Sequence, residues 1–263
     1  VRLFAAVYVP KDASQKYPIP LTRTPYSVGP YGVDHYPQRL GPSEHFEKEG
    51  FIFVYEDARG RYMSEGEFQQ VRPHVPNKRG PQDIDESTDT YDTIEWLLKN
   101  LPNHNGKVGM IGGSYLGFVQ WAAAVTHHPA LKAIIPQVSP PDPTRNMPWD
   151  HGAFMLAPGL WWSRIVKEKD ADLGIAFTQM ANGKAFFELP VTRVDDVFFK
   201  QNIPFFDLWL SRPSIDQWGG SFRDDQIRSV KIPTLHVSGI WDGDGIGTKT
   251  HWQDGRLAGR KNQ

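Results

Sequence analysis

The chain has 263 residues, enough for one large α/β domain or two small ones, and its 39% of hydrophobic residues can form a buried core. A formal net charge of -1 without runs of like charge argues against nucleic acid or an acidic membrane surface as a partner. The sequence has no cysteine, which excludes disulfides and cysteine metal sites, and no apolar run is long enough to span a bilayer.

The first half of the chain alternates strand and helix patterns. Residues 2–10 alternate apolar and polar side chains, which is typical of a half-buried strand. In chain order, the patterns then predict a strand at 19–24, a short helix at 44–49, a strand at 51–55, a helix at 83–100, a strand at 107–111, a helix at 115–127 and a strand at 131–138. This alternation predicts an α/β fold with a mostly parallel sheet and right-handed crossovers.

The helix at 83–100 carries its own start signal. Asp83 and Glu86 are placed as a capping pair, and Tyr91, Ile94 and Leu98 share one face. We therefore expect Asp83 to begin this helix and the three apolar side chains to be buried.

The pattern changes after residue 139. Helical segments rich in Trp and Phe occupy 140–228, and we predict that they form a helical cap inserted between core segments 1–139 and 229–263. These aromatic residues either form ordinary core or line a pocket. The sheet is expected to resume at 232–238, before a last helix at about 246–257.

Residues 108–118 run from an apolar strand through glycines around Ser114 into a helical pattern. This is typical of a nucleophile elbow, a tight turn that exposes a serine hydroxyl near backbone N–H groups. The general elbow has a glycine two residues on either side of the serine; Gly112 fits, but Leu116 occupies the second position and Gly117 follows it. The alternative is a glycine-rich turn with an incidental serine.

The elbow suggests roles for two further groups. The backbone N–H of Tyr115 is the generic oxyanion donor of such a turn. Asp242 follows the last predicted strand, where a buried carboxylate can hold a catalytic imidazole; its alternative role is to cap the next helix.

Five stretches in order resemble the motifs of one family of serine hydrolases. They are Arg23-Thr24-Pro25-Tyr26, Asp57-Ala58-Arg59-Gly60 with Ser64-Glu65-Gly66, residues 91–97, the elbow, and Trp241-Asp242-Gly243. The family includes X-Pro dipeptidyl-peptidases, cocaine esterase, α-amino-acid ester hydrolases and glutaryl acylases. Its elbow has tyrosine directly after the serine and glycine third, as Tyr115 and Gly117 stand here.

The resemblance implies an α/β-hydrolase core, a helical cap after the sixth strand and a C-terminal β-sandwich, which we expect this chain to lack. It places the catalytic histidine about thirty residues beyond the acid, and none of the nine histidines in the sequence has that position. His251 follows Asp242 too closely, and we interpret it as a surface residue of the last helix.

The resemblance also implies roles around the site. The phenol of Tyr26 would be the second oxyanion donor. Asp244 matches one of three carboxylates with which α-amino-acid ester hydrolases hold the substrate amine; Gly245 and Pro148 stand near the other two positions. Asp244 either accepts an amine or caps a helix. We expect the substrate to contact four further residues, which are Trp149, Asp150, Trp161 and Trp162.

The motif in the loop after the third predicted strand is expected to have a structural role. Asp57, Arg59, Ser64 and Glu65 are interpreted as a charge network that orders this loop.

The leading hypothesis is a serine hydrolase of the X-Pro dipeptidyl-peptidase or acyl-esterase type. Ser114 would be acylated by an ester or amide carbonyl, and water would then release the acyl group. An α-amino-acid ester hydrolase or β-lactam acylase specificity remains open, as does a binding module that keeps the fold without the chemistry. The expected ligand is a small ester, amide or short peptide; no cofactor or metal is expected, and homo-oligomers are compatible with the sequence.

Overall fold

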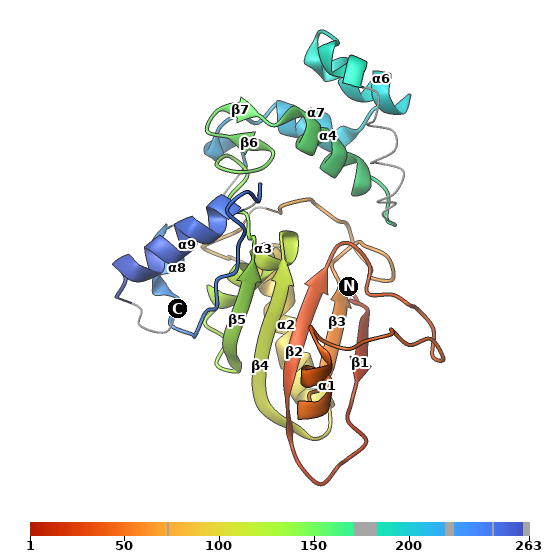
Figure 1. The fold of residues 1–263 in the computed structure, drawn as a ribbon, viewed down its shortest axis with the longest axis vertical. Coiled ribbons are helices and arrows are strands. Elements are labelled where there is room, and N and C mark those ends of the chain that lie inside the picture. Colours follow the sequence, from red (N-terminus) through yellow and green to blue (C-terminus); the bar gives the residue numbers. More distant parts are fainter. Residues whose placement is uncertain (73, 171–182, 219–223, 244, 260–263) are drawn as a thin grey trace.

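The central sheet is built from the first half of the chain. The computed structural model describes residues 1–72, 74–170, 183–218, 224–243 and 245–259. The strands are β1 (Ala5–Tyr8), β2 (Tyr17–Thr24), β3 (Phe53–Asp57), β4 (His104–Gly113) and β5 (Leu131–Gln137), in the spatial order β1-β3-β2-β4-β5. Neighbours are parallel except for β1, which runs antiparallel to β3 at the edge (Figure 1). The predicted mostly parallel α/β sheet is therefore confirmed.

Two helices cover one face of this sheet. Besides the short α1 (Glu44–Glu49), the first half forms α2 (Glu86–Asn100) and α3 (Tyr115–Ala124). The main apolar core joins strand residues such as Leu21 and Met110 to Ile94 of α2 and Val119 of α3. Tyr91, expected in the buried face of α2, is 39% exposed.

The start of α2 differs from the prediction. Asp85, not Asp83, is the N-cap: its carboxylate accepts from the N–H groups of Ser87 and Thr88, and the Thr88 hydroxyl receives the Asp85 N–H. This is a capping box with threonine in place of the expected glutamate. Glu86, expected to complete the box, turns inward instead and is 5% exposed.

Helices dominate the chain after β5. In order, the elements are β6 (Trp149–Asp150), β7 (Ala153–Phe154), α4 (Leu156–Ile165), η1 (Gly183–Phe187), η2 (Val191–Arg193), α6 (Val194–Phe199), α7 (Pro204–Leu210), η3 (Ile215–Trp218), α8 (Asp224–Ser229) and α9 (Gly245–Leu257). In Figure 1, α4, α6 and α7 lie beyond the carboxyl ends of the parallel strands. Boundaries of a separate cap at 140 and 228 remain a prediction.

The predicted strand at 232–238 is wrong as a continuous strand. Only isolated parallel bridges join Thr234 to Ile134 and Val237 to Gln137 of β5. The N–H of Leu235 donates to the Ile134 carbonyl at 3.0 Å, but the next donor position in β5 is Pro136, which has no N–H. The missing bond interrupts the ladder halfway along the segment.

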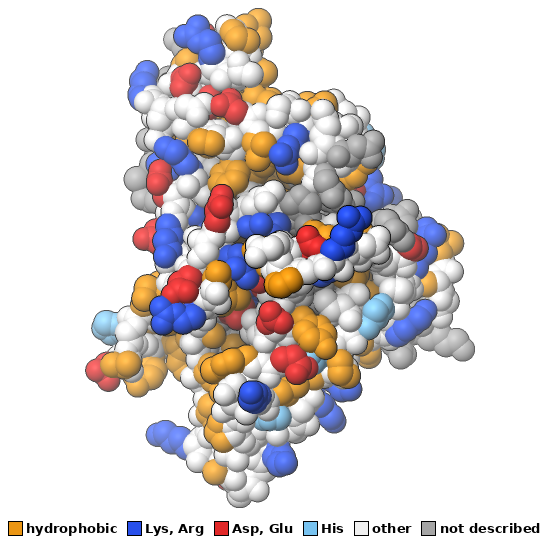
Figure 2. All heavy atoms as spheres, turned by 180° about the vertical axis from the view of Figure 1, so that it is seen from behind, with side chains coloured by type: hydrophobic (Ala, Val, Ile, Leu, Met, Phe, Trp, Pro, Cys, Tyr) orange, Lys and Arg blue, Asp and Glu red, His pale blue; other side chains and the backbone are white. Residues whose placement is uncertain are grey.

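Charged side chains of both signs are mixed on one face of the molecule (Figure 2). On the face seen in Figure 2, acidic and basic side chains are interspersed with apolar ones. Within the described ranges, no helix combines the length and apolar character needed to cross a membrane.

Candidate active site

Ser114 occupies the turn between β4 and α3 in a strained conformation. Its φ of 53° and ψ of -120° lie in the left-handed half of backbone space, which side chains rarely adopt. Its N–H donates to the Gln137 carbonyl at 3.0 Å, and its carbonyl accepts from the N–H groups of Gly117 and Phe118 at 2.8 and 3.1 Å. Hydrogen bonds on both sides hold the strained residue in place, as expected for an elbow that presents a nucleophile.

The glycines around Ser114 are explained by close packing. Gly112 has a φ of +155°, and a Cβ there would lie 2.5 Å from the Leu116 Cβ. At Gly117 a Cβ would lie 2.8 Å from the Ser139 Cβ and 3.1 Å from the Gln137 carbonyl oxygen. The first turn of α3 therefore rests directly on the end of β5, so the glycine is needed at position 117 rather than at 116.

The side chain of Tyr115 is anchored in the protein interior. Its side chain is fully buried, and its hydroxyl donates to Glu86 at 2.9 Å. The other oxygen of Glu86 accepts from Arg23 at 3.0 Å, and Arg23 donates to Glu56 at 2.5 Å. Burial raises the pKa of Tyr115 well above its ordinary value, so the phenol stays protonated and donates.

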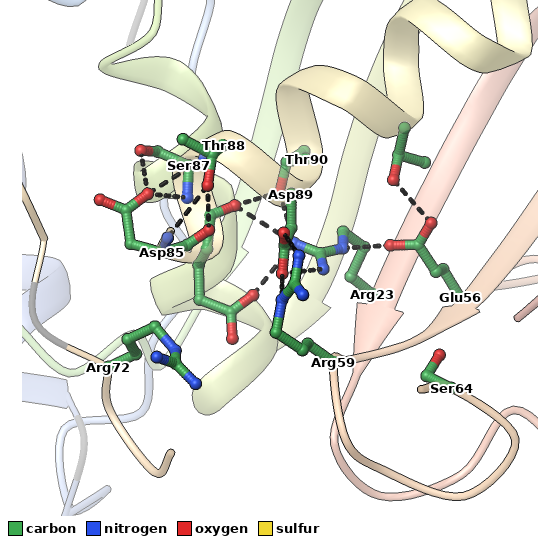
Figure 3. A network of polar contacts seen from close by, with 12 residues as sticks. Arg23, Glu56, Arg59, Ser64, Arg72, Asp85, Ser87, Thr88, Asp89 and Thr90 are labelled. Carbon is green, nitrogen blue, oxygen red and sulfur yellow. Dashed lines mark hydrogen bonds and ion pairs between the residues drawn. The ribbon is translucent and has the colours of Figure 1, made fainter. Parts of the chain in front are cut away.

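The buried charges beneath the elbow form one network, shown in Figure 3. Burial alone would lower the pKa of Arg23, but Glu56, Glu86 and Asp89 raise it above its usual value. Burial raises the pKa of both Glu56 and Glu86. Arg59 adds a bidentate pair with Asp89 at 2.9 and 2.5 Å. The network links β2, β3, α2 and the loop after β3.

That loop is ordered as the sequence predicts. Asp57 accepts from the Val28 N–H at 3.0 Å and from the Tyr31 hydroxyl at 2.8 Å, while Ser64 donates to the Asp57 carbonyl at 2.6 Å. Glu65 accepts from the Arg2 backbone at 2.9 Å. The contacts of Asp57, Ser64 and Glu65 thus order the loop, whereas Arg59 of the same motif pairs with Asp89 of α2.

Tyr26 lies beside the elbow, on the loop that follows β2. Its ring meets the Tyr115 ring edge-on at 6.4 Å between centroids. Its hydroxyl accepts a 2.8 Å hydrogen bond from Nε1 of Trp162, which is 3% exposed on α4. The structure thus brings together Tyr26, Tyr115 and Trp162. A phenol that accepts a hydrogen bond donates more strongly, which suits a group aimed at a developing oxyanion.

Trp162 was expected to contact substrate, and its contact with Tyr26 has no signal in the sequence. The two residues are 136 positions apart. A cavity of about 10 Å³, roughly the space of one water molecule, lies between Tyr115 and Trp162.

The other expected substrate-binding residues are spread over the helical segment. The Trp149 indole donates to the Trp209 carbonyl at 2.8 Å and packs edge-on against Phe154. Asp150 is exposed and lies 2.6 Å from Nδ1 of His151. Trp161 is half-buried and packs against the main core. Asp244 lies outside the described residues.

The burial expected for Asp242 and the exposure expected for His251 are both wrong. Asp242 is exposed rather than buried, in a turn where its N–H donates to the Gly239 carbonyl at 3.3 Å. The interrupted strand before it does not bring it into the protein interior. His251 is 3% exposed and packs on Trp121 with ring centroids 4.5 Å apart, so it is a core residue of α9 and not a surface one.

A second cluster of serine, histidine and aspartate lies at the start of α2. The Ser87 hydroxyl donates to Asp85 at 2.5 Å, and Nδ1 of His74 is 3.3 Å from the same carboxylate. The Ser87 hydroxyl also lies 3.5 Å from Nδ1 of His74. Because the carboxylate of Asp85, and not the imidazole, is the shared partner and also caps α2, the cluster has the arrangement of a helix cap and not of a triad.

A groove of about 580 Å³ lies between β1 and α2 and is lined by residues such as Phe4, Arg59 and Trp96, away from the elbow. In the part of the chain that the structure describes, no three His, Asp or Glu side chains are grouped to hold a metal ion.

Comparisons with known proteins agree with the five motifs. Residues 1–256 match the profile of the family described as X-Pro dipeptidyl-peptidase (S15 family). Cocaine esterase of Rhodococcus sp. (strain MB1 Bresler) is 30% identical over 258 residues, covering 92% of this chain and 42% of the esterase. The solved aminopeptidase from the marine sediment archaeon Thaumarchaeota archaeon has a TM-score of 0.77 and 28% identity, covering 98% of this chain and 44% of its own.

A solved α-amino acid ester hydrolase is nearly as similar. Its TM-score is 0.76 at 28% identity, with 97% of this chain and 43% of that chain covered. The chain therefore has the α/β-hydrolase fold and spans less than half the length of these relatives.

Proposed function

The chain belongs to the X-Pro dipeptidyl-peptidase (S15) family, and from this membership we propose that the protein is a serine hydrolase with Ser114 as its nucleophile. The single observation that carries the proposal is the strained backbone of Ser114, with φ 53° and ψ -120°, at the strand-to-helix turn. Strain held by flanking hydrogen bonds is typical of functional positions. A serine that occurs incidentally in a glycine-rich turn is not expected to have a strained backbone.

The proposed reaction follows acyl transfer. The Ser114 Oγ attacks the carbonyl carbon of an ester or amide while a histidine takes its proton. The carbonyl oxygen becomes an oxyanion, which accepts hydrogen bonds from the Tyr115 N–H and the Tyr26 hydroxyl. Collapse of this intermediate expels the alcohol or amine, which receives the proton. Water then attacks the acyl-enzyme by the same steps and restores Ser114.

Asp242 is proposed as the carboxylate that orients the histidine. None of the histidines among the described residues is assigned as the base; His251 is excluded by its burial against Trp121. We therefore expect the 263-residue chain alone to hydrolyse p-nitrophenyl acetate little or not at all. Hydrolysis at an enzyme-like rate that disappears in His251→Ala would overturn this assignment.

The substrate proposed is a small ester, amide or short peptide with an apolar acyl part. Support comes from the aromatic side chains beside the elbow, Trp162 and Tyr26, and from the names of the relatives, which are those of esterases and peptidases. The rival proposal is a binding module of the same fold. It predicts ligand affinity without turnover.

The decisive experiment uses the natural gene product that contains this chain. Ser114→Ala should lower kcat for p-nitrophenyl acetate by on the order of a millionfold, the loss found for a triad serine. Ser211→Ala, which removes an exposed hydroxyl on the end of α7, is the matched control and should leave kcat unchanged. A Ser114→Ala variant that keeps a tenth of the rate would refute the nucleophile. No turnover in the natural protein would favour the binding module.

A further inference from the structure

Arg61 connects two parts of the site that lie far apart in the sequence. The residue is only 1% exposed, in the loop after β3. Its Nε donates to the Pro25 carbonyl at 2.8 Å, directly before Tyr26 in the chain. One terminal nitrogen donates to the Val166 carbonyl at 3.2 Å and also to the Glu168 carbonyl, just past the end of α4.

The guanidinium is well matched to this place. The last carbonyls of a helix lack partners within the helix and carry partial negative charge, so a buried cation there is favourable. The rings of Tyr62 and Phe68 lie 5.4 and 5.1 Å from the Arg61 Cζ. Burial lowers the pKa of Arg61 from its ordinary value. Five donors in a rigid fork allow one side chain to hold both segments at once, which a lysine ammonium cannot do with the same geometry.

These contacts form a closed circuit of residues that starts and ends at Arg61. Arg61 holds Pro25, the next residue is Tyr26, and the Tyr26 hydroxyl accepts from Trp162 at 2.8 Å. Trp162 lies in α4 (Leu156–Ile165), whose end returns to Arg61. The Tyr62 N–H adds a second tie, to the Lys169 carbonyl at 3.2 Å. The Arg61 side chain therefore bridges the loop that bears Tyr26 and the helix that bears Trp162.

We propose that Arg61 is a positioning residue, which acts through Tyr26 by fixing the direction of its hydroxyl. The proposal rests on the proposed function, in which Tyr26 donates to the oxyanion. An oxyanion donor has to be preorganised, and a misplacement of about 1 Å costs roughly a hundredfold in rate. In the described part of the chain, Arg61 donates to the main-chain carbonyls of Pro25, Val166 and Glu168. Its proposed effect on the reaction therefore has to appear as a coupling to Tyr26.

A double-mutant cycle tests that coupling in the natural gene product. Arg61→Lys is expected to lower kcat roughly 10- to 100-fold with little change in KM. Tyr26→Phe should lower kcat about a hundredfold. In the Tyr26→Phe background, Arg61→Lys should cost less than about twofold more, because the donor it positions is already gone.

The matched control is Arg2→Lys, which alters an arginine paired with Glu65 of the same loop. The Arg2 side chain is 91% exposed, so its replacement changes a charge pair of the loop at the surface, away from Pro25 and α4. We expect kcat within about threefold of wild type. If Arg61→Lys lowers kcat by the same factor with and without the Tyr26 hydroxyl, Arg61 has only a general structural role and the proposal is wrong.

An NMR measurement that does not depend on enzyme activity can test the positioning role of Arg61 independently of the proposed function. The indole ¹⁵N–¹H resonance of Trp162, assigned with Trp162→Phe, should shift in Tyr26→Phe and shift in the same direction in Arg61→Lys. A resonance unmoved by Arg61→Lys overturns the positioning role even in an inactive protein. If the resonance shifts as expected but Tyr26→Phe keeps full kcat, then the circuit of contacts through Arg61 is supported and the proposed oxyanion role of Tyr26 is wrong. Should Arg61→Lys not fold, Trp162→Phe replaces it in the cycle and must show the same coupling.

Discussion

The hydroxyl of Tyr115, the residue that follows the proposed nucleophile, donates a 2.9 Å hydrogen bond to the buried carboxylate of Glu86. Glu86 in turn accepts from Arg23 at 3.0 Å. The start of α3 is therefore fastened to α2 and β2 through one carboxylate. The elbow is therefore supported by a polar contact in the protein interior.

This contact predicts a large loss of stability in Glu86→Gln. Removing one partner of a buried ion pair costs about 3–5 kcal/mol, and we expect the lower end because Glu56 still faces Arg23. The free energy of unfolding is measured by urea titration. Glu95→Gln is the control on the same helix: its side chain is 58% exposed and pairs with His128, so less than about 1 kcal/mol should be lost. Equal losses in the two variants would contradict the network's importance.

The close approach of α3 to β5 predicts that Gly117→Ala is harmful. A new methyl group would lie 2.8 Å from the Ser139 Cβ and 3.1 Å from a main-chain oxygen, and no rotamer change relieves the second contact. Overpacking costs about 1–3 kcal/mol, more than the gain of about 1 kcal/mol from replacing a helical glycine.

Thermal unfolding should therefore give a lower Tm for Gly117→Ala, and kcat should fall because the elbow is displaced. Gly80→Ala serves as the comparison, since nothing lies within 4 Å of a Cβ at that position. A Gly117→Ala variant as stable and active as Gly80→Ala would show that the helix can move without consequence.

The cap of α2 predicts a defined pH dependence. Burial alone would raise the pKa of Asp85, but hydrogen bonds from His74, Ser87, the Val75 N–H and Lys78 outweigh it and lower the pKa. Since the folded-state pKa lies below the ordinary value of about 3.9, the ionised carboxylate stabilises the fold above that pH. This stability is lost as the pH falls through the folded-state pKa.

Asp85→Asn should therefore cost about 1–3 kcal/mol at pH 7, and the difference from wild type should shrink below about pH 4. Urea unfolding at pH 7, 5 and 3.5 measures it. Asp83→Asn, at the position favoured by the sequence, should cost much less at every pH. A larger loss in Asp83→Asn than in Asp85→Asn would contradict the observed cap.

The family resemblance at Asp244 leads to a prediction of substrate specificity. Asp244 matches one of three carboxylates expected to hold a substrate amine, and the other two positions are Gly245 and Pro148. A single carboxylate should give only a modest preference for free amines, so hydrophobic acyl esters should be the better substrates. The measurement compares kcat/KM for phenylglycine methyl ester and its des-amino analogue in wild type and Asp244→Asn. A preference above about a hundredfold, roughly 2.7 kcal/mol, that disappears in Asp244→Asn would contradict this.

Local patterns predicted much of the fold. The bounds of α1 agree with the sequence, and each strand from β2 to β5 overlaps a predicted strand. Apolar periodicity reports which side of a segment is buried, and the alternation of short apolar strands with helices limits the sheet to a parallel one. The tight turn at Ser114 was likewise predicted from the glycines around it, at 112 and 117.

Contacts between distant residues were not predictable in this way. Periodicity places Arg61 and Trp162 in a loop and a helix but does not say that both meet the segment of Tyr26. The cap at Asp85 is supported by His74 and Lys78, which lie earlier in the loop that leads into α2 and fold back onto its carboxylate. The exposure of Asp242 follows from how the chain before it pairs, and the run of apolar residues at 232–238 favoured a full strand.

Pro136 gives the two halves of the proposed catalytic apparatus different resistance to local opening. The proposed nucleophile follows β4, which pairs with β2 on one side and β5 on the other. The proposed acid follows a segment that meets β5 only at isolated bridges on either side of the proline. Amide hydrogens of that segment, such as those of Leu235 and Val237, should exchange with solvent well before those of Met110 and Ile111. We therefore expect the segment before the proposed acid to open locally more often than the strand before the proposed nucleophile.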